Sequence, residues 1–177
     1  GIAPKQGLSR RTGPTQSRDE QRSIAIDRKW RSVELLQALS HEGPAAVREA
    51  LTMISQGEPP SAQQGKTSLA PKITKQEAVL NFSNDSETLV NAIRAFTYEP
   101  GAWCTWRNES FKITSAVIVE DYPLPPAEIV VDGQRVIVGC GIKSSIELLT
   151  VVPAGKKEMS AADWARGARL QGGESFD

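Results

Sequence analysis

Five short apolar segments, separated by turn signals, fill residues 102–152, and they constrain the fold more than any other feature of this 177-residue chain. Short apolar runs bounded by glycine, proline and aspartate are typical of β-strands. Between two of the runs, Asp132-Gly133 is a strong signal for a two-residue hairpin. The pattern predicts five strands: residues 102–106, 111–119, 128–131, 135–140 and 146–152.

The stretch that follows the last strand, residues 152–167, combines a glycine turn carrying two lysines with a short helix. Ser160 precedes Asp163 by three residues, which resembles a capping box at the start of that helix. Five short strands and a small closing helix predict a mainly β fold. We expect a five-stranded OB-like Greek-key barrel with a short C-terminal helix, closed by Trp164 as a plug. A five-stranded sandwich is the structural alternative.

Helical patterns precede the strands. Ser32 is expected to cap a first helix, and Gly43-Pro44 is expected to end it and to begin a second, which Gly57 ends. Apolar residues at helical spacing give this pair an apolar face: Leu35, Leu36, Leu39, Val47, Leu51 and Ile54. A third helix should begin at Ser83 or Ser86 and reach about Phe96, with a core face of Leu89, Ile93 and Phe96.

Composition divides the chain into five parts. Residues 1–28 are rich in glycine, proline, serine and arginine and predict a disordered basic tail. A helical segment spans 29–57, and 58–71 has the composition of a linker. The strand-rich domain occupies 72–170, and a second disordered tail is expected at 171–177.

Charge and residue composition limit the classes of function that this chain can have. Residues 1–75 carry 12 basic and 7 acidic side chains, whereas residues 76–177 carry 9 and 14, so a local basic stripe can bind a polyanion although the net charge is zero. Cys104 and Cys140 lie in apolar strands and are expected to be buried free thiols, which suits a reducing cytoplasm. One histidine and two separated cysteines predict no metal site. No apolar run is long enough to span a membrane, so no membrane partner is expected.

Four motifs resemble the C-terminal region of methionyl-tRNA formyltransferase. The first is Ala-Pro-Lys-Ile-Thr-Lys-Gln-Glu-Ala at 70–78, and the second is Ile-Arg-Ala-Phe at 93–96 with Pro-Gly-Ala at 100–102. The third is Pro-Ala-Gly-Lys-Lys-Glu-Met at 153–159. The last, Ala-Ala-Asp-Trp-Ala-Arg-Gly at 161–167, resembles the way actinobacterial members end. The motifs occur in the family's order and spacing.

This resemblance implies a two-part enzyme. In the family, a Rossmann-like catalytic domain binds 10-formyltetrahydrofolate, and an OB-fold domain helps to hold initiator methionyl-tRNA. Residues 29–57 then look like a helical remnant of the catalytic domain. The family's catalytic asparagine, histidine and aspartate, and its folate loop, have no counterpart here. We therefore assign no catalytic residue and no cofactor to this chain and expect it to be inactive alone, 10-formyltetrahydrofolate being a substrate of the missing domain.

The resemblance also implies where tRNA phosphates bind. Lys72 and Lys75 lie at the linker exit, where the family places phosphate-contacting lysines. A lysine suits this role because it is a point charge on a long stem, and each neutralised phosphate releases counterions. Lys156 and Lys157 are adjacent in the glycine turn, so we expect one to face the ligand and the other to face solvent or a carboxylate.

Three further residues are candidates for contact with the nucleic acid. Arg94 is expected either to contact phosphate or to pair with Glu99. Trp103 and Trp106 are possible stacking platforms for bases. Because 103 and 106 point to opposite faces of a strand, one tryptophan is expected in the core and the other at the surface.

Two alternatives remain open on the sequence. The first alternative to a methionyl-tRNA formyltransferase is a stand-alone, non-catalytic OB-fold module that binds nucleic acid or protein. The second is a fragment of a sugar-nucleotide formyltransferase. The Ala-Gly-Lys-Lys turn at 154–157 counts against the second. If the helices at 32–55 have lost the sheet on which they pack, we expect them to self-associate, to fray or to pack loosely on the barrel.

Overall fold

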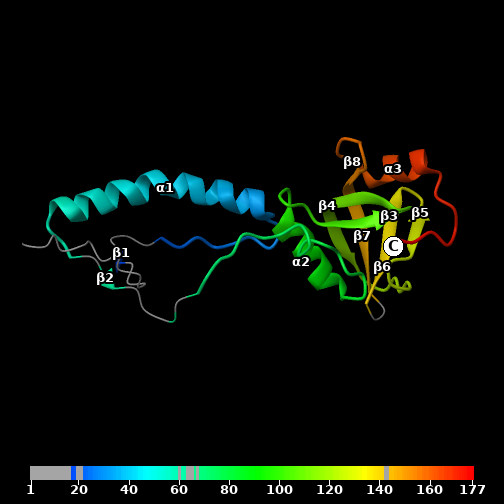
Figure 1. Ribbon diagram of the computed structural model, residues 1–177, viewed down its shortest axis with the longest axis horizontal. Helices are drawn as coiled ribbons and strands as arrows, with labels where there is room; N and C mark the ends of the chain where they lie inside the picture. Colours follow the sequence, from blue (N-terminus) through cyan, green and yellow to red (C-terminus); the bar gives the residue numbers. More distant parts are fainter. Residues whose placement is uncertain (1–16, 19–21, 60, 63–65, 67, 142–143) are drawn as a thin grey trace, which may run out of the picture. The chain divides into compact units, whose positions relative to one another are not determined.

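The computed structural model describes residues 17–18, 22–59, 61–62, 66, 68–141 and 144–177 (Figure 1). The chain divides into two compact units, which are described separately. The larger unit comprises residues 25–38 and 72–177, and the smaller comprises the described parts of 1–24 and 39–71.

The larger unit is built on a six-stranded antiparallel sheet with the strand order β3-β4-β7-β6-β5, and β8 pairs with β7. Its strands are β3 (Trp103–Trp106), β4 (Glu109–Val119), β5 (Ile129–Asp132), β6 (Arg135–Cys140), β7 (Ser144–Pro153) and β8 (Met159–Ser160). All five predicted strands are present, so the mainly β prediction is confirmed. The closed five-stranded barrel is not confirmed, because the strand path is open and β8 is a sixth strand.

Two hairpin turns and one close approach shape the sheet. Arg107 and Asn108 join β3 to β4 with left-handed φ angles of 50° and 63°, the geometry of a two-residue hairpin turn. Asp132 pairs with Arg135, so the second turn is Gly133-Gln134, one residue later than predicted. A Cβ at Gly139 would lie 1.9 Å from the Pro125 carbonyl oxygen, so only glycine lets the preceding loop cross β6.

Helix α2 (Ser86–Phe96) packs on β4 through its apolar face (Figure 1). Leu89 and Ile93 are buried, as predicted, and the helix ends at Phe96. The predicted serine cap is wrong. Asp85, in an extended conformation, accepts a hydrogen bond from the Thr88 amide at 2.8 Å. This carboxylate sits one residue before the helix, where it is placed to satisfy a free N–H.

Helix α3 (Ala161–Ala168) confirms its predicted cap. The Ser160 hydroxyl accepts a hydrogen bond from the Asp163 amide at 3.0 Å. Trp164 is buried, with its ring centroid 4.6 Å from that of Phe111 and 5.1 Å from that of Trp106, and its role as the plug of a barrel stays a prediction. The helix therefore covers an aromatic cluster at one end of the sheet.

The last four residues are ordered, and the expectation of a disordered tail at 171–177 is wrong for them. The Ile129 amide donates to the Glu174 carbonyl at 2.8 Å, and the Asp177 amide donates to the Thr105 carbonyl at 3.0 Å. The tail thus bonds to both outer strands of the sheet, β5 and β3. Phe176 is only 3% exposed, and burial of its ring offsets the entropy lost in ordering the tail.

Helix α1 (Ser32–Ser55) is one continuous helix, so the predicted break at Gly43-Pro44 is wrong. Pro44 removes one backbone hydrogen bond, but extending an existing helix costs less than nucleating a new one. Ser32 is not the cap either. The Arg31 amide donates to the Glu34 carboxylate at 2.9 Å, and the Ser32 hydroxyl donates to the Thr97 carbonyl oxygen. None of the residues of α1 is buried.

Strands β1 (Ser17–Arg18) and β2 (Ser61–Ala62) pair with each other in the smaller unit. They fall in the segments predicted as tail and linker. Most of the predicted tail, residues 1–16 and 19–21, lies outside the described residues.

Cys104 and Cys140 are free and buried, as predicted. Burial raises the pKa of the Cys140 thiol to about 12 and raises the pKa of Cys104 as well. Among the described helices, none is long and apolar enough to cross a bilayer.

Candidate nucleic-acid interface

Lys75 and Trp103 form the first cluster of predicted site residues. The segment before α2 runs beside β3, where the Trp103 amide donates to the Ala78 carbonyl at 3.0 Å. The Lys75 ammonium lies 4.8 Å from the Trp103 ring centroid, and the indole Nε1 donates to the Lys75 carbonyl at 2.8 Å. This cation–π contact is worth about 0.5–1 kcal/mol at an exposed site. The lysine therefore covers one face of the tryptophan and holds a positive charge over it.

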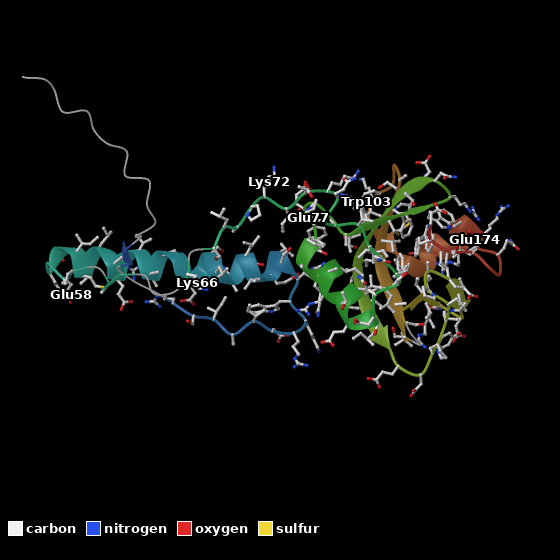
Figure 2. All side chains as sticks on the ribbon, turned by 60° about the horizontal axis from the view of Figure 1, so that its bottom comes forward. Glu58, Lys66, Lys72, Glu77, Trp103 and Glu174 are labelled. Carbon is white, nitrogen blue, oxygen red and sulfur yellow. The ribbon has the colours of Figure 1, made fainter. Side chains whose placement is uncertain are left out.

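Lys72 lies at the start of the same segment and is exposed. A small turn follows it, in which the Thr74 amide donates to the Glu77 carboxylate at 2.7 Å. This bond and that from the Thr74 hydroxyl lower the pKa of Glu77. Figure 2 shows Lys72, Glu77 and Trp103 in one region of the larger unit. The structure thus brings Lys72, Lys75 and Trp103 into one part of the surface.

Lys156 and Lys157 project from the turn between β7 and β8, and both are exposed. Gly155 takes the left-handed conformation that this turn needs, with φ of 67°. Lys156 lines a cavity of about 600 Å³, whereas Lys157 does not. We call this cavity the aromatic hollow; its other lining residues include Trp106, Phe111, Met159 and Trp164. The two lysines therefore differ in surroundings, and which of them faces a ligand stays a prediction.

Trp106 lines the aromatic hollow and packs edge-on against Trp164. The Arg107 guanidinium lies 4.3 Å from the Trp106 ring centroid and pairs with Glu174. The Trp106 Nε1 donates to the same carboxylate at 3.2 Å, and the arginine lowers the pKa of Glu174. Both tryptophans are half-buried, but only Trp106 joins the aromatic cluster. Base stacking on either ring stays a prediction.

Arg94 holds the chain rather than projecting freely. Its Nε donates to the Trp30 carbonyl at 2.8 Å, and its terminal nitrogens donate to the Asn91 amide oxygen at 3.1 Å and the Asp27 carbonyl at 3.4 Å. The predicted alternative was a pair with Glu99, and the guanidinium binds main-chain carbonyls instead. Phosphate contact by Arg94 stays a prediction.

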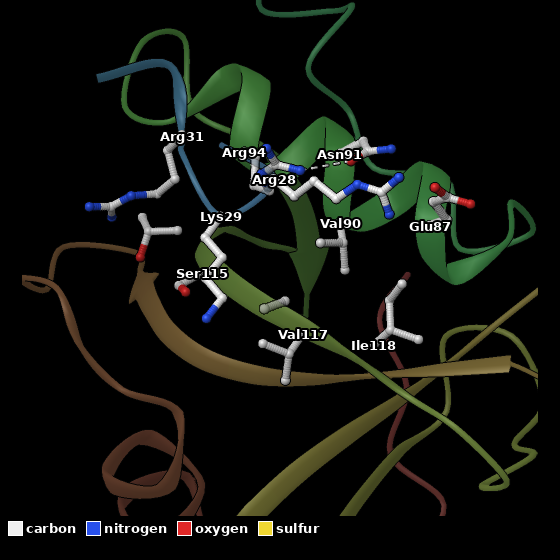
Figure 3. A pocket seen from close by; sticks show the side chains of 12 residues that line it. Arg28, Lys29, Arg31, Glu87, Val90, Asn91, Arg94, Ser115, Val117 and Ile118 are labelled. Carbon is white, nitrogen blue, oxygen red and sulfur yellow. Dashed lines mark hydrogen bonds between the residues drawn. The ribbon is translucent and has the colours of Figure 1, made fainter. Parts of the chain in front are cut away.

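Sequence reasoning missed three cations near Arg94. Arg28, Lys29 and Arg31 line a cavity with it, of about 810 Å³, between the segment before α1, helix α2 and strand β4 (Figure 3). We call this cavity the α2–β4 groove. The signal was present as the run Arg-Lys-Trp-Arg at 28–31, but it falls on the boundary drawn between the predicted tail and the helical segment.

The chemistry of the described residues can be stated for metal ligands and thiols. In the described ranges, no group of three or more histidine, cysteine, aspartate or glutamate side chains could hold a metal. Burial raises the pKa of both thiols, which makes them poor nucleophiles. Exposed lysines near half-buried tryptophans are instead suited to contact a polyanion.

Comparison with known proteins gives these features a context. Residues 72–169 match the family described as formyl transferase, C-terminal domain. The methionyl-tRNA formyltransferase of Renibacterium salmoninarum is 38% identical over 144 residues, which are 80% of this chain and 47% of that protein. That of Paenarthrobacter aurescens is 40% identical over 136 residues, or 76% of this chain and 44% of that protein. The chain spans about half the length of the curated relatives it matches.

Solved structures resemble the fold at low identity. HypX from Aquifex aeolicus, in complex with tetrahydrofolic acid, aligns with a TM-score of 0.66 and 16% identity, over 85% of this chain and 28% of HypX. Another structure of HypX, a variant, aligns with a TM-score of 0.64, over 80% of this chain and 27% of HypX. This likeness concerns the fold alone.

Proposed function

We propose, from the premise that the chain belongs to the family of formyl transferase C-terminal domains, that it is the tRNA-binding part of a methionyl-tRNA formyltransferase. Such an enzyme moves a formyl group from 10-formyltetrahydrofolate to the amino group of initiator methionyl-tRNA. The observation that carries the proposal is the family match over residues 72–169, which spans Lys72, Lys75, Lys156 and Lys157. The relatives' name favours this substrate over a sugar nucleotide.

The surface lysines support a phosphate-binding role. All four are exposed, and no acidic side chain within the described residues forms an ion pair with any of them. Such side chains keep their charge available for phosphate. Contacts of this kind position an RNA without reading its sequence, so we expect binding that depends on shape and salt.

The same proposal includes how the sheet closes. We infer that the sheet acts as an OB-like barrel in which the C-terminal tail bridges the two outer strands, β3 and β5. The hydrogen bonds of Glu174 and Asp177 to these strands support this inference.

Catalysis is assigned to residues outside this chain. We propose that 29–57 belongs to the catalytic domain of the complete enzyme, which acts in the cytoplasm on 10-formyltetrahydrofolate. The exposed apolar residues of α1 support this, since a helix with such a face normally packs on other structure. The chain's one histidine, His41, is exposed on α1, which does not favour a role as a general base.

Fluorescence anisotropy with labelled initiator tRNA tests the proposal. If Lys72, Lys75 and Lys156 each neutralise one phosphate, affinity should fall by roughly 20- to 40-fold between 50 and 200 mM salt. Lys75→Ala or Lys156→Ala should each reduce the slope of log K against log salt by about 1. Arg48→Ala, on α1, is the matched control and should leave the slope unchanged.

Two outcomes would contradict the proposal. Binding that does not weaken with salt would exclude the phosphate contacts. Formylation of methionyl-tRNA by this chain alone, with 10-formyltetrahydrofolate, would overturn the assignment of catalysis to another domain.

A further inference from the structure

The α2–β4 groove lies apart from the four lysines assigned to tRNA. One wall is a single face of α2, formed by residues at helical spacing: Glu87, Val90, Asn91 and Arg94. The other wall is strand β4, which contributes residues 114–118, and Arg28, Lys29 and Arg31 come from the segment before α1 (Figure 3). All these residues belong to the larger unit. Its volume of about 810 Å³ is that of a binding cleft.

The strand presents its edge to the groove. A face of a β-strand contributes alternate residues, whereas here five consecutive residues line the wall. Strand β3 pairs with β4 only at 109–112, while β7 pairs with it at 111–119. Within the described residues, no strand pairs with the later half of β4 on the side opposite β7. This half therefore has backbone groups that another extended chain can pair with.

The groove also offers apolar contact. Val117 and Ile118 line it and are 42% and 45% exposed, and Val90 lines it from α2. Figure 3 shows Val90 and Ile118 directed into the space between helix and strand, whereas the Val117 side chain lies on the other side of the strand. An occupant with alternating apolar side chains would cover this surface.

The charge of the groove is positive. Four cations line it, and Glu87 is its one acidic residue among those described. Arg31 is already paired with Glu34 and Tyr98, and Arg94 with main-chain oxygens. Arg28 and Lys29 form no ion pair with the described residues, and Figure 3 shows both side chains reaching over the groove. They are the cations available to an acidic occupant.

We propose that the α2–β4 groove binds an extended acidic peptide of another protein, which adds a strand to the free edge of β4. Main-chain hydrogen bonds would pair it with residues 115–119, its apolar side chains would contact Val117 and Ile118, and its carboxylates would meet Arg28 and Lys29. This is strand addition, a recurrent mode of peptide recognition. The unpaired strand edge and the apolar floor favour a peptide over a nucleic acid, which would use neither.

The test uses the full 177-residue chain and a fluorescein-labelled six-residue peptide that alternates glutamate and valine. We expect saturable binding with a Kd below about 1 mM, and amide hydrogen exchange at 115–119 should slow by about tenfold on binding. The double variant Arg28→Glu, Lys29→Glu should weaken binding by at least about tenfold. Arg48→Glu is the matched charge control and should leave the Kd unchanged.

Two control peptides separate the contributions. The same peptide methylated on alternate backbone nitrogens should lose binding, because it cannot complete the strand pairing. A peptide that alternates lysine and valine should not bind. Equal binding of the methylated peptide, absence of saturation with the acidic peptide, or unchanged exchange at 115–119 would overturn the proposal. The proposal would also be overturned if initiator tRNA displaced the acidic peptide and if Arg28→Glu, Lys29→Glu weakened the binding of that tRNA. Those two results would assign the groove to nucleic acid.

Discussion

The sheet of the larger unit and helix α1 both carry many apolar residues, but only the sheet buries them. In the sheet, Phe111 and Ile113 are 1% and 0% exposed. On α1, Leu36 and Leu51 are 66% and 62% exposed, although their spacing marks a face as clearly as any strand pattern. Apolar periodicity therefore shows which side of an element is made for contact. Whether that side is buried depends on a partner surface.

This difference predicts two kinds of stability. The sheet depends on non-local burial, because its aromatic cluster joins β3, β4, α3 and the C-terminal tail. Helix α1 depends on local terms, such as the Arg31–Glu34 pair at its first turn. Substitutions should act on the two regions by different amounts.

The largest effect should come from truncating the aromatic cluster. Phe111→Ala removes contacts with Trp106, Trp164 and Phe176 and should lower the free energy of unfolding of the sheet by about 3–5 kcal/mol. Urea denaturation followed by tryptophan fluorescence measures this. Leu51→Ala is the matched truncation on α1 and should change it by less than about 0.5 kcal/mol. Equal losses would mean that α1 is buried in solution.

The next effect should appear on α1 itself. Pro44 has no backbone N–H, so Pro44→Ala restores one helical hydrogen bond and should stabilise the helix locally by up to about 3 kcal/mol. Slower amide exchange at residues 40–55 would show the gain, while the urea midpoint of the sheet should not move. If exchange at 40–55 did not slow, contacts other than the helix's own hydrogen bonds would have to hold α1 in place.

A smaller effect is expected at the start of α2. Asp85→Ala removes the acceptor for the Thr88 amide and should destabilise the start of α2 by less than Phe111→Ala destabilises the sheet. Because α2 packs on β4, this loss should appear in the urea denaturation of the sheet. Asp85→Asn keeps a capping oxygen and is the control. A loss of the same size in Asp85→Asn would point to charge rather than to the hydrogen bond.

The smallest effect should come from pH. The Arg31 guanidinium lowers the pKa of Glu34 from its usual 4.5 to about 2. A depressed pKa means that the pair stabilises the start of α1 fully above about pH 4.5 and is lost as the pH falls towards 2. The contribution should be about 0.5 kcal/mol, because both side chains are partly exposed. Carbon-detected NMR titration of Glu34 measures the pKa, and Arg31→Gln should return it towards 4.5.

Much of the sheet could be predicted from local signals. Turn residues such as Gly133 mark strand ends, and apolar alternation marks the strands, because both depend on a few neighbouring residues. The Ser160–Asp163 cap was predictable for the same reason. Lys72 and Lys75 came from the family resemblance and Lys156 and Lys157 from the glycine turn; all four are exposed, and their contact with phosphate stays a prediction.

Other features depended on contacts distant in sequence. The tail at 171–177 has the composition of a disordered end, yet the ring of Phe176 is buried against Phe82, Phe111 and Trp164. Arg94 was a candidate for phosphate, but the chain at 27–30 lies close enough to accept its hydrogen bonds. Gly43-Pro44 is typical of a helix end, and here the helix continues through it.

The sequence by itself determined the order of the strands along the chain, the Ser160 cap of α3, and the family motifs that name a function. Only the tertiary structure decided that the sheet stays open with a tail across its outer strands, that Arg94 binds the main chain, and that β4 shows a free edge beside Arg28 and Lys29. The physical reason is the distance along the sequence between the residues that interact. Turns and caps are settled within a few residues, whereas burial, edge pairing and the availability of a charge depend on which distant segments meet.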